Sequence, residues 1–341
     1  MKPLRILVLM HVDLVPPASL KGYSDKQIGE WKTEYDVVST LREMGHEVQP
    51  LGLYDDMGVI RRAIEEWKPD LAFNLLEEFH GNSLFDHHVA SYLELMQVPY
   101  TGCNPRGLML AHDKALAKKI LSFHRIRTPN FVVFPRGRRV HVPKRLRFPL
   151  FVKSLVEEGS YGIAQASIVP TEEKLRERVD FLHNRLDTPV IAEEYIEGRE
   201  FYMALIGNVR VEALSVLELV FENLPEDVPR IATRKVKWDW QYQKQYGIDV
   251  KPARDLSAAE QDTLRKLGKR MYRLLDMSGY ARIDVRVTAA GEIYVLEANA
   301  NPDISFGGEM CIAAEAVGIK YPALLERILR LGLSYDPLMR R

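Results

Sequence analysis

The sequence is poor in cysteine and in long apolar runs. Its 341 residues include only two cysteines, Cys103 and Cys311. Two cysteines are too few for a disulfide framework, and these two do not have the spacing of zinc ligands, so we expect a protein of the reducing cytoplasm. No apolar run approaches the ~18 residues of a membrane span. The apolar stretch 6–10 is shorter than the core of a signal peptide and ends at polar residues.

The sequence also lacks an excess of charge of one sign. Lys plus Arg and Asp plus Glu each number 47, so the formal net charge is zero. This balance argues against a dedicated binder of nucleic acid or of a membrane surface. Hydrophobic residues make up 46% of the chain, as in a soluble globular protein, so a core of ordinary size can form. The length favours about two domains, at ~150 residues each.

The first hundred residues alternate between strand-like and helix-like patterns. Apolar runs predict strands at 4–10, 46–53, 70–76 and 98–101, and helical spacing of apolar residues predicts helices at 34–45, 59–67 and 85–95. Strands that alternate with helices imply parallel βαβ units. We therefore predict an α/β domain with a parallel sheet over residues 1–105.

The rest of the chain is richer in strands. Helical patterns cover 112–123, 171–186, 257–279 and 322–331. Strand patterns cover 131–134, 148–156, 163–169, 190–196, 200–206, 281–288 and 292–299. The polar, basic and aromatic segment 225–252 has no clear periodicity and is long for a loop. Loops of that length are usually functional lids or disordered segments.

The segment 281–302 predicts a hairpin with a functional face. If residues 290–291 are the centre of a two-residue turn, Asp284 lies opposite Glu297 and Arg282 lies opposite Asn299. Because side chains alternate along a strand, these four share one face. The other face is then an apolar core made of Ile283, Val285, Val287, Ala298, Leu296 and Tyr294.

This face carries a pattern typical of a metal and phosphate site. Two carboxylates directly across a strand pair repel each other and destabilise the sheet unless a cation neutralises them. Asp, Glu and Asn supply the oxygen ligands that Mg²⁺ prefers, often together with substrate phosphates. Arg282 would hold a phosphate or a developing negative charge. The alternative is a solvated hairpin face with an arginine–carboxylate pair.

Lysines and glycines earlier in the chain suggest anion binding. Lys153 ends a strand and leads into a glycine-containing segment, 157–162, whose backbone N–H groups would turn toward an anion. A tight hairpin explains the same glycines equally well. Lys114 begins a helix, where a cation is unfavourable unless an anion is near. The acidic segment 191–200 is either a surface hairpin or a place where backbone groups pair an adenine edge and Glu200 accepts from ribose hydroxyls.

In this order, the features resemble the ATP-grasp superfamily, and most closely the D-alanine–D-alanine ligases. The resemblance runs from about residue 1 to 335 and is carried by signatures at 98–102, 113–119, 158–163, 281–284 and 296–299. It implies an α/β fold, α+β in the ATP-grasp part. A parallel-sheet domain over 1–105 would precede a small lobe with the glycine loop, 106–210, and a C-terminal lobe, 211–335, with a lid at 225–252 and a magnesium hairpin at 281–301.

The resemblance also implies roles for individual residues. ATP would contact Lys114, Lys153 and Gly159 through its phosphates, Glu193, Glu194, Tyr195 and Ile196 through adenine, and Glu200 through ribose. Two Mg²⁺ ions, or Mn²⁺ in their place, would be ligated by Asp284, Glu297 and Asn299. Catalysis and substrate positioning would involve Arg282 for the tetrahedral intermediate, Lys237 beside Trp238 in the lid, Ser160, Glu34 for the amino group and Gly308 with its backbone amide for the oxyanion.

The sequence departs from the family in its amino-acid pockets. The amino-terminal glycine–serine fingerprint is absent, and Gly308 falls about where family members place a serine that grips the acceptor carboxylate. We therefore predict retained ATP chemistry with an altered acceptor.

The predicted activity is an ATP-dependent carboxylate–amine ligase that forms an amide through an acylphosphate and releases ADP and phosphate. Its partners would be a small carboxylate and a small amine, with an amino acid favoured, and neither nucleic acid nor a membrane. Family members are commonly homodimers. Two alternatives remain: a non-catalytic ATP-binding regulatory protein on the same fold, and a ligase whose acceptor is not an amino acid.

Overall fold

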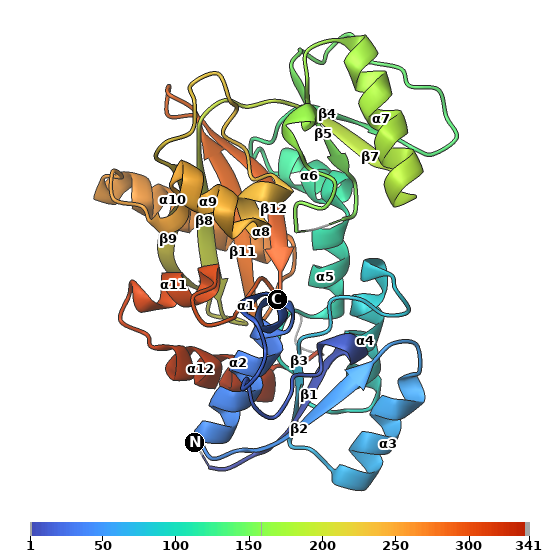
Figure 1. Ribbon diagram of the computed structural model, residues 1–341, viewed down its shortest axis with the longest axis vertical. Helices are drawn as coiled ribbons and strands as arrows, with labels where there is room; N and C mark the ends of the chain where they lie inside the picture. The colour runs from blue at the N-terminus through green and yellow to red at the C-terminus, as the bar shows by residue number, and fades with distance from the viewer. Residues whose placement is uncertain (1, 158, 338–341) are drawn as a thin grey trace.

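The computed structural model describes residues 2–157 and 159–337. Glu158, part of one family signature, lies outside the described residues. The N-terminal region is a parallel sheet in the order β2-β1-β3 (Figure 1). Its strands and helices are β1 (Arg5–His11), α1 (Asp25–Glu30), α2 (Lys32–Glu43), β2 (Glu47–Leu53), α3 (Met57–Trp67), β3 (Leu71–Asn74) and α4 (Asp86–Leu95). The predicted strand at 98–101 is wrong: Tyr100 forms only an isolated bridge to Ala72.

Two helices lead from this region into a four-stranded antiparallel sheet. Asp113 separates the helices, and its side chain accepts a hydrogen bond from the Leu116 amide at 2.8 Å. The helix predicted at 112–123 begins at Lys114, and the helix before it was not predicted. The sheet has the order β4-β7-β5-β6. The elements are α5 (Pro105–His112), α6 (Lys114–Phe123), β4 (Phe131–Phe134), β5 (Leu150–Ser154), β6 (Ile168–Val169), α7 (Glu172–Leu186) and β7 (Val190–Glu194). The strand predicted at 163–169 shrinks to β6.

The C-terminal region is built on a five-stranded antiparallel sheet with the order β10-β9-β8-β11-β12. One face packs on α10, and the other packs toward α11 and the segment 225–252. That segment is folded: it holds two short helices and the edge strand β10. The elements are β8 (Arg199–Ile206), β9 (Glu212–Phe221), α8 (Arg234–Trp238), α9 (Trp240–Tyr246), β10 (Ile248–Pro252), α10 (Ala258–Leu274), β11 (Tyr280–Val287), β12 (Ile293–Ala300), α11 (Glu309–Glu315) and α12 (Tyr321–Ser334).

The predicted α/β class with an N-terminal parallel sheet is confirmed. Helix α12 packs against α2 and β3, so the last helix of the chain returns to the first sheet (Figure 1). Within the described residues no helix combines the length and the hydrophobicity that a membrane crossing requires.

The β11–β12 hairpin has the predicted pairing at Asp284 and Arg282, but its turn differs from the predicted two-residue turn. The turn has three residues, 289–291: Thr288 donates to the Glu292 carbonyl at 3.0 Å, and Gly291 has a φ of +78°. This connection alone would shift every pair by one residue. A β-bulge after Asp284 restores the register, so that Asp284 still pairs with Glu297 and Arg282 with Asn299.

The bulge makes the predicted core composition wrong at two positions. Val285 pairs with Val295, and Val287 pairs with Ile293. These residues belong to the core, where we predicted Leu296 and Tyr294. Because a shift of one residue moves a side chain to the other face of a sheet, Leu296 is released from the core.

Candidate active site

Four polar side chains converge on the hairpin face that the sequence predicts. Arg282 donates two hydrogen bonds to Asp284, of 2.8 Å from Nε and 2.9 Å from Nη2. Asn299 donates to the same carboxylate at 3.1 Å. Burial raises the pKa of Asp284, against the opposing effect of Arg282. The guanidinium lies 4.8 Å from the ring centre of Tyr202 and 3.3 Å from Glu309. Arg282 is therefore buried and held from two sides.

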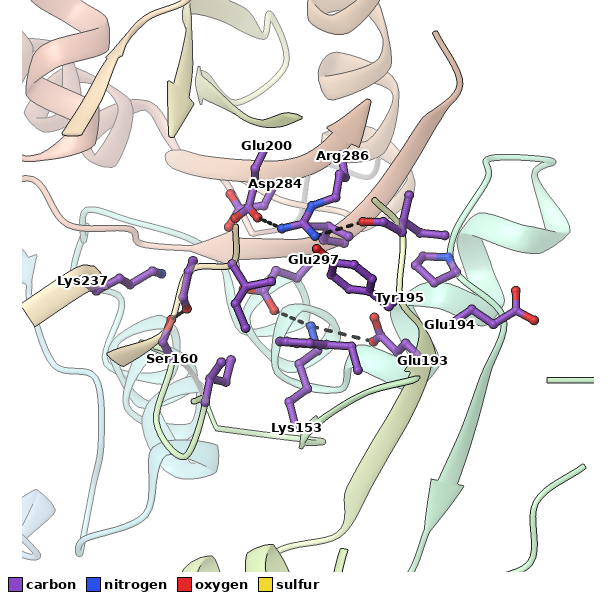
Figure 2. Close-up of a pocket in the computed structure, with 17 residues that line it drawn as sticks. Lys153, Ser160, Glu193, Glu194, Tyr195, Glu200, Lys237, Asp284, Arg286 and Glu297 are labelled. Atoms are coloured by element: carbon purple, nitrogen blue, oxygen red, sulfur yellow. Dashed lines mark hydrogen bonds and ion pairs between the residues drawn. The ribbon is translucent and has the colours of Figure 1, made fainter. Parts of the chain in front are cut away.

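Lys153 joins the two sheets at this point. Its Nζ lies 3.0 Å from Glu297 on β12 and 3.8 Å from Glu193 on β7, and Figure 2 shows the lysine between the two carboxylates. Burial alone would raise the pKa of Glu297, but Lys153, Lys114 and Lys237 lower it far below its usual value. Glu297 is thus a half-buried anion close to three lysines.

Two cationic residues of this site were missed at the level of sequence. Lys118, one helical turn after Lys114, lies 3.4 Å from Glu193, and burial lowers its pKa to about 8. Arg286 lies 2.5 Å from Glu200 and donates to the carbonyl of Ile196 at 3.0 Å. Strand alternation could have revealed Arg286, because it continues the face that carries Arg282 and Asp284. The arginine means that Glu200 already has a cationic partner.

A cavity of about 590 Å³ lies between the two sheets. The bulge places Leu296 in its wall beside Glu297, and the segment 231–232 covers it from the other side. Of the predicted nucleotide-binding residues, it is lined by Lys153, Glu193, Glu194, Tyr195, Ile196 and Glu200. Apolar and charged side chains thus meet in one enclosed space.

Glu194 contributes to this wall in a limited way. Its carboxylate accepts hydrogen bonds from Asn130 Nδ2 and from the Arg147 amide, both at 2.9 Å. In Figure 2 the side chain points away from Lys153 and Glu193. The Glu194 carboxylate is therefore bonded to the protein outside this charge cluster, and its amide also donates, to the Asn130 carbonyl at 2.9 Å.

The glycine loop is tied to the segment 225–252. Ser160 donates to the Ala232 carbonyl at 2.7 Å, and Trp238 Nε1 donates to the Gly159 carbonyl at 3.0 Å. Lys114 donates to the Glu157 carbonyl at 2.7 Å. These bonds hold the loop and the segment together over the cavity.

A second, larger cavity of about 1460 Å³ opens beside the first. Lys237 lines both, and Arg282, Asn299 and Gly308 line the larger one. Glu34 is buried in α2 and is not among the residues that line this cavity. Burial raises the pKa of Glu34 to about 7, and the charge of Asp303 adds to the shift. The structure therefore brings the predicted residues into two adjoining cavities, except for Glu34 and for Lys114, which lines neither of the two.

The donor set on the hairpin suits a hard divalent cation. Asp284, Glu297 and Asn299 offer only oxygen ligands, which Mg²⁺ takes from a few carboxylates and from substrate phosphates. Among the described residues, no group of three or more His, Cys, Asp or Glu side chains is arranged to hold a metal by itself. A metal here would thus need phosphate oxygens as well.

Comparisons with known proteins agree with this geometry. Residues 117–330 match the family model for the D-Ala–D-Ala ligase C-terminus. A D-alanine–D-alanine ligase of Desulforudis audaxviator is 30% identical over 299 residues, 87% of this chain and 91% of that protein. An uncharacterised protein, y4sG, of Sinorhizobium fredii is 31% identical over 304 residues, 86% of this chain and 85% of its own length.

The fold has a close match among solved structures. The crystal structure of the D-alanine–D-alanine ligase from Bacillus anthracis complexed with ATP superposes with a TM-score of 0.74 at 25% identity and covers 97% of each chain. This chain belongs to the D-alanine–D-alanine ligase family of ATP-grasp ligases.

Proposed function

We propose that the chain joins a small carboxylate to an amine at the expense of ATP, through an acylphosphate. The observation that carries this proposal is the convergence of Asp284, Glu297 and Asn299 beside Lys153 and Lys237, where the two cavities meet. The smaller cavity would take the nucleotide, which the ATP complex of the Bacillus anthracis ligase supports. The larger cavity would take the carboxylate and the amine.

The chemistry divides into two displacements. A carboxylate oxygen attacks the γ-phosphorus, the bond to the bridging oxygen breaks and ADP leaves. The amine nitrogen then attacks the carbonyl carbon of the acylphosphate, inorganic phosphate leaves, and the nitrogen loses a proton. Transfer of this kind depends on positioning and on stabilising charge. It requires no covalent bond to the protein.

The described residues supply that charge. Asp284, Glu297 and Asn299 would hold two Mg²⁺ ions, which neutralise the β- and γ-phosphate charge when bound. Lys153 and Lys114 would bind phosphate oxygens, since both are buried near Glu297. Arg282 would stabilise the oxyanion of the tetrahedral intermediate. The segment 225–252, tied to the glycine loop, would exclude water that hydrolyses an acylphosphate.

Product analysis tests this mechanism. The enzyme is given ATP, Mg²⁺ and single D- or L-amino acids, with hydroxylamine as a small neutral nucleophile that traps an acylphosphate as a hydroxamate. We expect ADP, phosphate and a hydroxamate. Asp284→Asn should abolish all three, whereas Asp262→Asn, on the exposed face of α10 beside Lys266, should leave them unchanged. Formation of AMP and pyrophosphate would refute the acylphosphate route.

A further inference from the structure

The larger cavity is strongly acidic. Among the described residues that line it, five are carboxylates: Glu77, Asp86, Asp249, Asp303 and Glu309. The only lysine or arginine side chains among those residues are Lys237 and Arg282. Such a wall attracts cations and repels anions.

The two cations are already committed to other groups. Arg282 is bound by Asp284 on one side and by Glu309, at 3.3 Å, on the other. Lys237 also lines the smaller cavity, together with the carboxylates of Asp284 and Glu297. It therefore serves the phosphate end of the site. A carboxylate on the acceptor would therefore be repelled by the carboxylates of the wall, with no uncommitted lysine or arginine among the described lining residues to bind it.

The loop before α11 leaves no space at position 308 for a hydroxyl side chain that could bind an acceptor carboxylate. A Cβ atom built on Gly308 would lie 2.6 Å from Asp303 Oδ2, so the space for a side chain at position 308 holds a carboxylate. Asp303 is fixed there by Thr33 Oγ1 at 3.1 Å, the Ser305 amide at 2.8 Å and Ser305 Oγ at 2.9 Å. These donors hold the Asp303 carboxylate in place.

Two further features of the wall suit a cation. Asp86 is 4% exposed, and His112 Nε2 lies 2.9 Å from its Oδ2. Its other oxygen, Oδ1, has no hydrogen-bond partner among the described residues and lies 4.0 Å from His87 Nδ1, so Asp86 adds negative charge behind the cavity surface. The indole of Trp238 also lines the cavity, held by its bond to Gly159. An aromatic face next to carboxylates is a favourable environment for an ammonium group.

We propose that the acceptor amine carries a second positive charge in place of a carboxylate: a diamine or an amine with a cationic side chain. Asp303 is the residue that selects for this charge, together with the acidic wall around it. This inference rests on the proposed ligase function, because the acceptor must occupy the larger cavity. It differs from that function in naming the charge of the acceptor.

Three amines of equal length test the proposal. The acylphosphate is generated from the amino acid that gives the most hydroxamate, and the acceptors are 1,3-diaminopropane, 1-aminobutane and 4-aminobutanoate. They share an amine nucleophile and differ in a distal ammonium, methyl or carboxylate group. Amide formation is measured by mass spectrometry, and kcat/KM is compared. We expect the diamine to exceed 1-aminobutane by about tenfold and 4-aminobutanoate by about a hundredfold, as one and two changes of charge at a partly desolvated site imply.

A matched pair of variants assigns the selection to Asp303. Asp303→Asn keeps the shape and the bond from the Ser305 amide, and should lower the preference for the diamine over 1-aminobutane by about fivefold to tenfold. Hydroxamate formation should stay within about twofold, which shows that the fold and the ATP site are intact. Asp262→Asn should change neither quantity.

The experiments separate the ligase function from the cationic acceptor. If hydroxamate forms but 4-aminobutanoate equals or exceeds the diamine, or if Asp303→Asn leaves the preference unchanged, the cationic acceptor is refuted while the ligase function stands. If no carboxylate yields hydroxamate, the ligase function is refuted, and the acceptor proposal with it.

Discussion

The two cavities differ in how their charges are arranged. In the smaller one three acids have basic partners: Glu297 and Glu193 share Lys153, and Glu200 has Arg286. In the larger one carboxylates outnumber cations among the described residues. The smaller cavity is lined mainly by strand positions of two sheets, and the larger one mainly by loops and helix ends.

This difference shows where the molecule can vary. A strand position is fixed by the ladder on both sides, so a change there disturbs the sheet as well as the site. A loop such as 301–308 can change without moving a strand. This arrangement would permit the acceptor region to change while the nucleotide site is retained. Substitutions in both regions test this difference.

The largest effect is expected when one carboxylate of the smaller cavity loses its charge. Glu297→Gln should lower kcat for ADP formation by about 10²–10³-fold, because the charge that would hold Mg²⁺ against the phosphates is lost. The measurement is a coupled ADP assay at saturating ATP. Glu292→Gln is the matched control, since Glu292 lies next to the same hairpin's turn but is exposed and bonded to Arg127 at 2.7 Å. A loss of less than about tenfold for Glu297→Gln would remove the hairpin from the mechanism.

The second test concerns a buried acid that has no ion pair among the described residues. Burial raises the pKa of Glu34 from 4.5 to about 7. Between those pH values the folded state binds more protons than the unfolded state, so the free energy of unfolding falls as pH rises through this window. Glu34→Gln removes that penalty. At pH 8 the variant should be more stable by up to about 3 kcal/mol, with little difference near pH 4.5.

Urea unfolding at pH 5 and pH 8 measures this difference. Glu43→Gln, on the exposed side of the same helix, should show no pH-dependent gain. If Glu34→Gln is equally stable at both pH values relative to the native protein, Glu34 titrates normally, and its burial does not oppose folding. If Glu34→Gln is more stable but has lower ligase activity, Glu34 opposes folding and contributes to substrate binding or catalysis.

The sequence was enough to place the paired charges but not the loops. Period-two alternation correctly predicts that Asp284 faces Glu297, even though the two-residue turn assumed for it is wrong. The turn of three residues and the bulge each shift the register by one, and the shifts cancel. A bulge has no local sequence signal here, so the position of Leu296 could not be predicted. Asp303 meets Gly308 only through the loop conformation, which alternation does not describe.

The bulge itself predicts opposite outcomes for two neighbours. Val295 is 1% exposed in the core, and Val295→Ala should lower the free energy of unfolding by about 2 kcal/mol with ATP affinity retained. Leu296 lines the smaller cavity, so Leu296→Ala should instead raise KM for ATP by about tenfold with a smaller loss of stability. Thermal melts and ATP titrations on both variants decide the matter. If Val295→Ala instead raised KM for ATP and Leu296→Ala mainly lowered stability, the hairpin would lack the bulge.

The smallest effect is expected at the hydrogen bond between the glycine loop and the segment 225–252, beside the smaller cavity. Ser160→Ala removes one hydrogen bond between the glycine loop and the Ala232 carbonyl, which is worth about 1 kcal/mol net. Because this bond joins two segments that enclose the nucleotide, its loss should raise KM for ATP about fivefold and increase ATP hydrolysis in the absence of an amine. Ser39→Ala is the control, since that hydroxyl donates within its own helix to the Tyr35 carbonyl at 2.7 Å. A change in acceptor preference for Ser160→Ala, with KM for ATP unaltered, would show that the loop serves the acidic cavity and that the division between the two regions is drawn in the wrong place.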